Sequence, residues 1–162
     1  MSLVWYAAYG SNLLRARFLT YLEGGSFEGG PPERGCADPS PPRDEAAMTI
    51  RHRRYFAYEA ARWGGGGVAF VDPYVPGTTL GRAYLITDEQ FADVLAQENG
   101  WPDRTPVDLG WYRCVLGMGE HDGVPVRTIT SLDRGPLRAA APAYRDVIRR
   151  GEAETAALPA WD

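Results

Sequence analysis

The segment from Thr87 to Gly100 carries signals for both ends of a helix and constrains the fold more than any other part of the chain. Thr87 is the expected N-cap, because Gln90 follows three residues later and completes a capping box. The dipeptide Asn99-Gly100 favours a left-handed stop. The apolar stripe of this helix consists of Phe91, Val94 and Leu95. The pattern therefore predicts an amphipathic helix packed against a core.

Glu98 occupies the next position on the apolar stripe of that helix, seven residues after Phe91. It is expected to be the last helical residue, where the helix dipole is negative. Burial and the dipole both disfavour the ionised carboxylate and raise its pKa, as a proton acceptor working near neutral pH requires. The alternative interpretation is a terminal glutamate that turns into solvent.

The composition excludes several classes of protein. A chain of 162 residues with 44% hydrophobic residues is expected to form one soluble domain. All 17 basic residues are arginine, a composition typical of GC-rich bacterial genomes, and the lack of lysine excludes Schiff-base chemistry. The net charge of −4 and the lack of a basic aromatic stripe argue against a nucleic-acid partner. No apolar run of membrane-spanning length and no signal peptide occur, so we expect a cytoplasmic protein without a membrane partner.

A strand followed by a tight turn and a helix is expected near the N-terminus. Leu3 to Tyr9 is a short apolar run bounded by Gly10, and residues 12–22 have apolar side chains at helical spacing, with Ser11 or Asn12 as the cap. A turn of this kind directs backbone N–H groups at one point and can hold an anion or a developing oxyanion. An ordinary capped turn is the alternative.

The rest of the chain predicts an α+β fold. Residues 24–45 are rich in Gly and Pro and are expected to form a long surface loop. Two hairpins are expected, one reversing at Pro76-Gly77 between strands at 68–71 and 80–86, and one reversing at residues 121–123. A final helix is expected from about Pro142 to Arg150. Many closely spaced strands with separated helices indicate a small mixed β-sheet that is strongly curved or barrel-like.

Few other motifs suggest chemistry. The run from Gly64 to Gly67 lacks the context of a nucleotide-binding loop, which leaves a bulge or crowded backbone approach, or a flexible linker, as its interpretation. His52 and His121 are far apart in sequence and are expected at the surface. Cys36 and Cys114 are too few for a disulfide framework or a structural zinc site. We therefore expect no metal and no cofactor.

The chain resembles the γ-glutamylcyclotransferase-like family. The resemblance begins with Tyr9-Gly10-Ser11-Asn12-Leu13 after an apolar strand and continues with Glu98 at the end of a helix. It extends through the glycine-rich segment after Trp63, the strands around Tyr112 and Arg127, and the helix from Tyr144 to Gly151. It covers nearly the whole chain as a single domain, in which residues 24–45 resemble an insertion.

This resemblance implies a small mixed barrel flanked by helices, which cleaves a γ-glutamyl amide without water. The α-amine of the substrate attacks its own side-chain carbonyl and releases 5-oxoproline and an amine. The resemblance makes Glu98 the general base. It also implies a substrate-binding loop formed by Tyr9, Gly10, Ser11, Asn12, Leu13 and Leu14.

The chain departs from the family pattern at Ile129, where the family often has a tyrosine. The missing contact could be supplied by Tyr112 or Tyr144. Two alternatives to the cyclotransferase remain open at this point. One is an amide hydrolase in which Glu98 activates water, and the other is a small-molecule binding protein without turnover. The oligomeric state is not indicated.

Overall fold

The computed structural model describes residues 1–161 and contains a curled β-sheet with three α-helices. The strands are β1 (Leu3–Ala8), β2 (Asp44–Ala60), β3 (Gly66–Thr87), β4 (Cys114–His121) and β5 (Val124–Thr130). The helices are α1 (Arg15–Glu23), α2 (Asp88–Asn99) and α3 (Pro142–Ala156), with short 3₁₀ helices η1 (Ser11–Leu13) and η2 (Ala61–Trp63). The predicted α+β class is confirmed.

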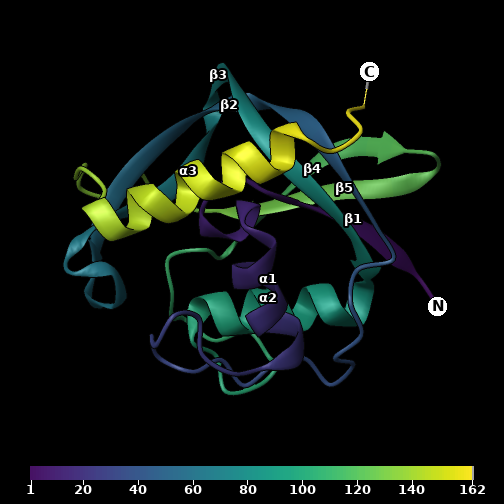
Figure 1. The fold of residues 1–162 in the computed structure, drawn as a ribbon, viewed down its shortest axis with the longest axis horizontal. Helices are drawn as coiled ribbons and strands as arrows, with labels where there is room; N and C mark the ends of the chain where they lie inside the picture. The colour runs from purple at the N-terminus through teal and green to yellow at the C-terminus, as the bar shows by residue number, and fades with distance from the viewer. Residues whose placement is uncertain (162) are drawn as a thin grey trace.

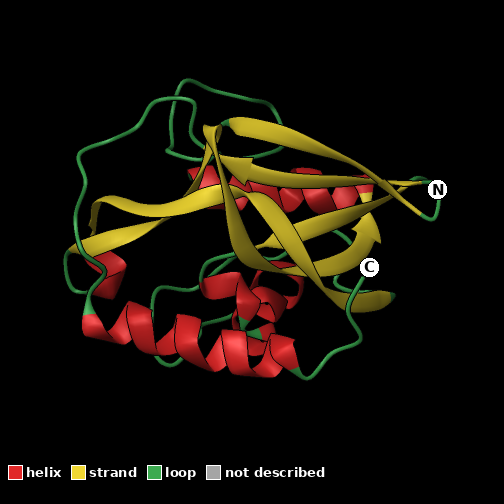
Figure 2. Ribbon diagram, turned by 90° about the horizontal axis from the view of Figure 1, so that it is seen from above, coloured by secondary structure: helices red, strands yellow, loops and turns green. Residues whose placement is uncertain are grey.

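Strand β1 lies at the centre of the sheet, which has the order β2-β3-β1-β5-β4 (Figure 1). It pairs with β3 in the antiparallel and with β5 in the parallel direction, so the sheet is mixed. The strands twist and bend strongly (Figure 2), and the sheet curls without closing into a barrel. A central buried strand explains why residues 3–8 are continuously apolar instead of alternating.

The two faces of β1 pack against different helices. Trp5, Ala7 and Tyr9 point into a core shared with Tyr144 and Ile148 of α3. On the other face, Val4, Tyr6 and Ala8 contact residues of α1 and α2, among them Phe18 and Phe91. Figure 1 shows α3 lying across the sheet, with α1 and α2 packed together on another side. Strand β1 therefore lies between α3 on one face and α1 and α2 on the other.

The expected hairpin reversing at Pro76-Gly77 is wrong. Residues 66–87 form one continuous strand, in which Pro76 pairs with His52 of β2. The register of the pair shifts between Ile50 and His52 and again between His52 and Arg54. Proline is tolerated in strands at such irregularities, so Pro76 and Gly77 lie where the β2–β3 ribbon is irregular and not where the chain reverses. The second expected hairpin forms, with Asp122 and Gly123 at positive φ in its turn.

Three boundaries differ from expectation. The α-helix after the first strand begins at Arg15, behind the η1 turn, and no side chain caps either helix, so neither Ser11 nor Asn12 is the cap. The Gly/Pro-rich loop ends earlier than expected, because β2 starts at Asp44. The last helix continues beyond Arg150 to Ala156.

In the glycine run at residues 64–67, Gly66 and Gly67 lie at a crowded backbone approach, whereas Gly64 and Gly65 adopt positive φ where the chain turns from η2 into β3. A Cβ atom on Gly66 would lie 2.2 Å from the Ala141 nitrogen, and one on Gly67 would lie 2.1 Å from the Arg138 carbonyl oxygen. The segment before α3 therefore packs directly on the start of β3. None of the helices within residues 1–161 is both long and apolar enough to span a membrane.

Candidate active site

The turn after β1 and the end of α2 meet in one cavity, although they are distant in sequence. The Asn12 side-chain amide donates a hydrogen bond to Glu98 Oε1 across 2.9 Å. The cavity has a volume of about 40 Å³. Its lining residues are Tyr6, Tyr9, Gly10, Ser11, Asn12, Ala69, Glu98, Tyr112, Ile129 and Tyr144. A single carboxyl group thus faces a polar turn and a wall of tyrosines.

Helix α2 presents Glu98 to this cavity through the end signals expected from its sequence. Thr87 and Gln90 form a reciprocal capping box, and Gly100 adopts the left-handed conformation. The helix ends at Asn99, one residue later than predicted. The Asn99 side-chain amide donates to the Tyr112 carbonyl oxygen and accepts a hydrogen bond from the Tyr112 backbone N–H. These two bonds fix the last turn of α2, which carries Glu98.

Glu98 is partly accessible from the cavity but lies in a desolvated environment, and burial raises its pKa. The charge of Glu33 adds to this shift in pKa, whereas the charge of Arg17 and the hydrogen bond from Asn12 oppose it. The group can therefore accept a proton at a higher pH than an ordinary carboxylate.

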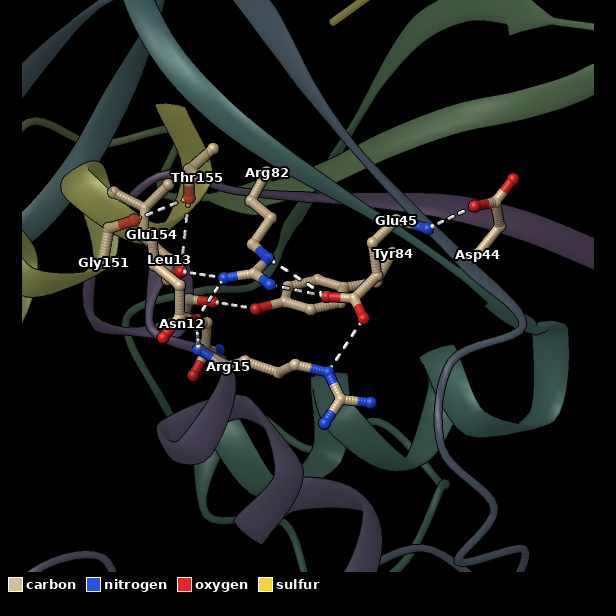
Figure 3. A network of polar contacts seen from close by, with 10 residues as sticks. All are labelled: Asn12, Leu13, Arg15, Asp44, Glu45, Arg82, Tyr84, Gly151, Glu154 and Thr155. Atoms are coloured by element: carbon tan, nitrogen blue, oxygen red, sulfur yellow. Dashed lines mark hydrogen bonds and ion pairs between the residues drawn. The ribbon is translucent and has the colours of Figure 1, made fainter. Parts of the chain in front are cut away.

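A buried network behind the turn holds its backbone in place (Figure 3). Tyr84 donates its hydroxyl proton to the Asn12 carbonyl oxygen at 2.6 Å, and Arg82 donates to the Leu13 carbonyl oxygen at 3.0 Å. Glu45 and Glu154 neutralise the buried Arg82 guanidinium. Because these contacts use the carbonyl groups, the Asn12 side chain is left to reach Glu98.

Two tyrosines complete the far wall. The Tyr144 hydroxyl accepts the Ala69 backbone N–H at 3.1 Å, and the Tyr112 hydroxyl donates to the Ala69 carbonyl at 2.8 Å. Burial raises the pKa of Tyr144 to about 12, so its phenol remains protonated near neutral pH. Both hydroxyls line the cavity together with Ile129.

Most of the residues expected at the site line the cavity, and two of them lie in the hydrophobic core instead. Tyr9, Gly10, Ser11 and Asn12 line the cavity with Glu98, whereas Leu13 and Leu14 do not line it and are buried in the protein interior. Two further lining residues, Tyr6 and Ala69, were not among the residues expected at the site. The alternation of β1 could have indicated Tyr6, because Tyr6 and Ala8 share the face that receives α2.

A second, larger cavity of about 170 Å³ adjoins the first and shares Ser11, Glu98, Tyr112 and Tyr144 with it. Its other polar lining residues are Arg17, Tyr21, Glu33, Arg62 and Gln97. Tryptophans 63 and 111 contribute apolar surface. Glu98 therefore lines both cavities.

No metal centre is apparent among residues 1–161, where no group of three or more His, Cys, Asp or Glu side chains is suitably placed. His52 bonds through Nδ1 to the Asp72 carbonyl group, and His121 stacks on Trp161. Both histidines lie outside the two cavities.

No protein-family model matches the chain. The curated relative histone deacetylase 5 of Arabidopsis thaliana is 35% identical over 187 aligned positions, which cover 93% of this chain. The chain spans only 28% of the length of that relative. Most of histone deacetylase 5 therefore lies outside the matched region.

Solved structures share the fold at low sequence identity. A γ-glutamyl cyclotransferase has a TM-score of 0.63 and 16% identity, with 99% of this chain and 90% of that chain covered. The human protein LOC79017 has a TM-score of 0.60 and 16% identity, covering 100% and 91% of the two chains. YkqA from Bacillus subtilis has a TM-score of 0.53 and 18% identity, and the match covers 99% of this chain and 57% of the YkqA chain. Over its described length, the chain has the γ-glutamyl cyclotransferase-like fold.

Proposed function

We propose that the protein cleaves a γ-glutamyl amide by intramolecular cyclisation, with Glu98 as the general base. The observation that carries this proposal is the contact between Asn12 and Glu98, which places one desolvated carboxyl group beside the turn after β1. The site contains no lysine, and Ser11 lies near neither of the two histidines that could activate it. A substrate that carries its own nucleophile suits such a site.

The reaction begins with proton transfer from the substrate α-ammonium group to Glu98. The freed amine attacks the γ-carbonyl carbon, a five-membered ring forms, and negative charge develops on the carbonyl oxygen. The second proton of the attacking nitrogen and the proton held by Glu98 pass to the departing nitrogen as the amide bond breaks. The products are 5-oxoproline and an ammonium compound, and Glu98 returns to its ionised state.

Two physical effects lower the activation barrier of this reaction. Ring closure within one substrate gains the proximity advantage of an intramolecular step, which can lower the barrier by roughly 7–11 kcal/mol in well-oriented systems. Backbone N–H groups of the turn at residues 10–12, beside Glu98, can stabilise charge on the carbonyl oxygen. Protonated Tyr112 and Tyr144 supply further hydrogen-bonding groups from the opposite wall.

The fold shared with a γ-glutamyl cyclotransferase supports the same reaction class. Deacetylation is not proposed, because the match to histone deacetylase 5 covers only 28% of that protein.

Product analysis tests the proposal. Purified protein is incubated with a panel of γ-glutamyl amides, and the products are identified by mass spectrometry. Formation of 5-oxoproline with the free amine is expected. Glutamate instead of 5-oxoproline would identify an amide hydrolase, and ligand-induced thermal stabilisation without any product would identify a binding protein.

A further inference from the structure

The second cavity contains two arginines that share a single carboxylate. Glu33 Oε1 lies 2.6 Å from an Arg62 nitrogen and 3.3 Å from Arg17 Nη1. Only 3% of the Arg17 side chain is exposed, and its Nε atom has no hydrogen-bond partner among the described residues. The cluster of Arg17, Glu33 and Arg62 therefore has one excess positive charge and one buried N–H group without a partner.

Glu33 belongs to the Gly/Pro-rich loop before β2, and helix α2 holds this loop in place. The Gly35 amide donates to Gln97 Oε1 at 2.9 Å, and the Ala37 amide donates to Asp93 Oδ2 at 3.0 Å. Because Gln97 precedes Glu98 on the same helix, the loop and the proposed base share one support. The arginine cluster is a preformed part of the site.

Charge balance indicates what this cavity accepts. With Glu98 ionised, the four side chains Arg17, Arg62, Glu33 and Glu98 sum to zero, as does a γ-glutamyl group with its ammonium and carboxylate. Proton transfer to Glu98 leaves the total charge of site and substrate unchanged, but the cluster of Arg17, Glu33 and Arg62 then has no second carboxylate beside it to offset its excess positive charge. A carboxylate on the departing amine that lies beside the two arginines is attracted to this local charge, whereas a positive group there is repelled.

The apolar walls indicate the shape of the same ligand. Trp63 packs against Tyr144 with ring centroids 5.1 Å apart, and Trp111 stacks on Tyr58 at 4.7 Å. Neither indole is fully buried, and both line the cavity while being held by a neighbouring ring. Fixed aromatic surfaces of this kind favour a flat apolar ligand group.

We propose that the second cavity is the subsite for the departing amine and that it accepts an aromatic amino acid, whose carboxylate binds Arg17 and Arg62 and whose ring lies against Trp63 and Trp111. This inference rests on the proposed function. It makes γ-glutamyl aromatic amino acids the favoured substrates.

Three matched compounds test the subsite, with 5-oxoproline release as the readout. They are γ-glutamyl-phenylalanine, γ-glutamyl-phenethylamide, which lacks the carboxylate, and γ-glutamyl-alanine, which lacks the ring. We expect kcat/KM for the first to exceed that for each of the others by about tenfold or more, the scale of a charge-assisted hydrogen bond. The Arg62 charge also lowers the pKa of Glu98, so Arg62→Gln is expected to lower kcat/KM for all three compounds, and by a clearly larger factor for the two acids than for the phenethylamide. The exposed Arg149→Gln serves as the matched control and should change none of these values.

The outcomes separate this inference from the proposed function. If none of these compounds yields 5-oxoproline while other γ-glutamyl amides of the panel do, the subsite assignment is overturned; if no γ-glutamyl compound yields it, the proposed function fails. If all three compounds are converted equally, or if Arg62→Gln lowers all three rates by the same factor, the reaction stands and the subsite assignment is overturned. Arg62 is preferred to the deeply buried Arg17 for substitution, because its side chain is 27% exposed and its loss threatens folding less.

Discussion

Asn12 and Glu98, which are separated by 86 positions in the chain, meet through a 2.9 Å hydrogen bond from the amide to the carboxyl group. The same Asn12 amide nitrogen lies 3.1 Å from the Tyr6 hydroxyl. Asn12 thus links the turn after β1 to the end of α2. The hydrogen bond from Asn12 holds the Glu98 carboxyl group beside the turn, and every prediction about catalysis below depends on this geometry.

The rate should depend on pH through Glu98. A general base must be ionised, and burial raises the pKa of this carboxyl above the ordinary glutamate value of about 4.3. The value of kcat/KM is therefore expected to increase with pH through a midpoint above that value and to be lost as the pH falls below it. A pH–rate profile measures this midpoint, and full activity at pH values near 4 would contradict the assignment.

Asn12→Asp should move that midpoint to higher pH. The substitution places a second carboxyl group at hydrogen-bonding distance from Glu98, and a nearby like charge raises the pKa of a carboxylate. The variant is expected to lose activity at neutral pH and to recover part of it in alkaline buffer. Asn12→Ser, which adds no charge, is the control and should show no comparable shift.

Gly10→Ala should obstruct the first cavity. The added Cβ would lie 2.8 Å from the Tyr144 hydroxyl oxygen and 3.3 Å from the Ala69 Cβ atom, where only a glycine leaves room. We expect kcat/KM to fall by about a hundredfold or more, the scale of a small misplacement at a reacting centre. Gly117→Ala in β4 is the matched control, because its Cβ would meet no atom within 4 Å. Equal activity of the two variants would exclude this cavity as the site.

Gly67→Ala should act on stability. Its Cβ would approach the Arg138 carbonyl oxygen to 2.1 Å, so the segment before α3 would have to shift. Overpacking of this kind typically costs about 1–3 kcal/mol of unfolding free energy. Chemical denaturation measures the change against Gly117→Ala, and an unchanged midpoint would contradict the close backbone approach at Gly67.

The sequence revealed those parts of the fold that local signals determine. The capping box at Thr87 and the stop at Gly100 are properties of short segments, and both formed as predicted. The hairpin predicted at Pro76-Gly77 was wrong, because turn residues occur both where a chain reverses and where a long pair of strands is irregular. The pairing with β2 decides between the two cases, and no local pattern shows that pairing. The site residues divide in the same way. Glu98 could be predicted from its position on the apolar stripe of a helix, whereas Ala69 and Glu33 line the cavities only because of long-range packing, which no local pattern shows.

The most direct measurement compares Glu98→Gln with the unmodified protein in 5-oxoproline release from a γ-glutamyl amide, with unfolding followed in parallel. The raised pKa means that the folded state binds the Glu98 proton more tightly than the unfolded state. Stability is therefore lost as the pH rises through that pKa, and a neutral glutamine removes this cost. We predict that Glu98→Gln unfolds at the same or a higher temperature at neutral pH and releases no 5-oxoproline. Turnover at the unmodified rate by a folded Glu98→Gln protein would contradict the central claim.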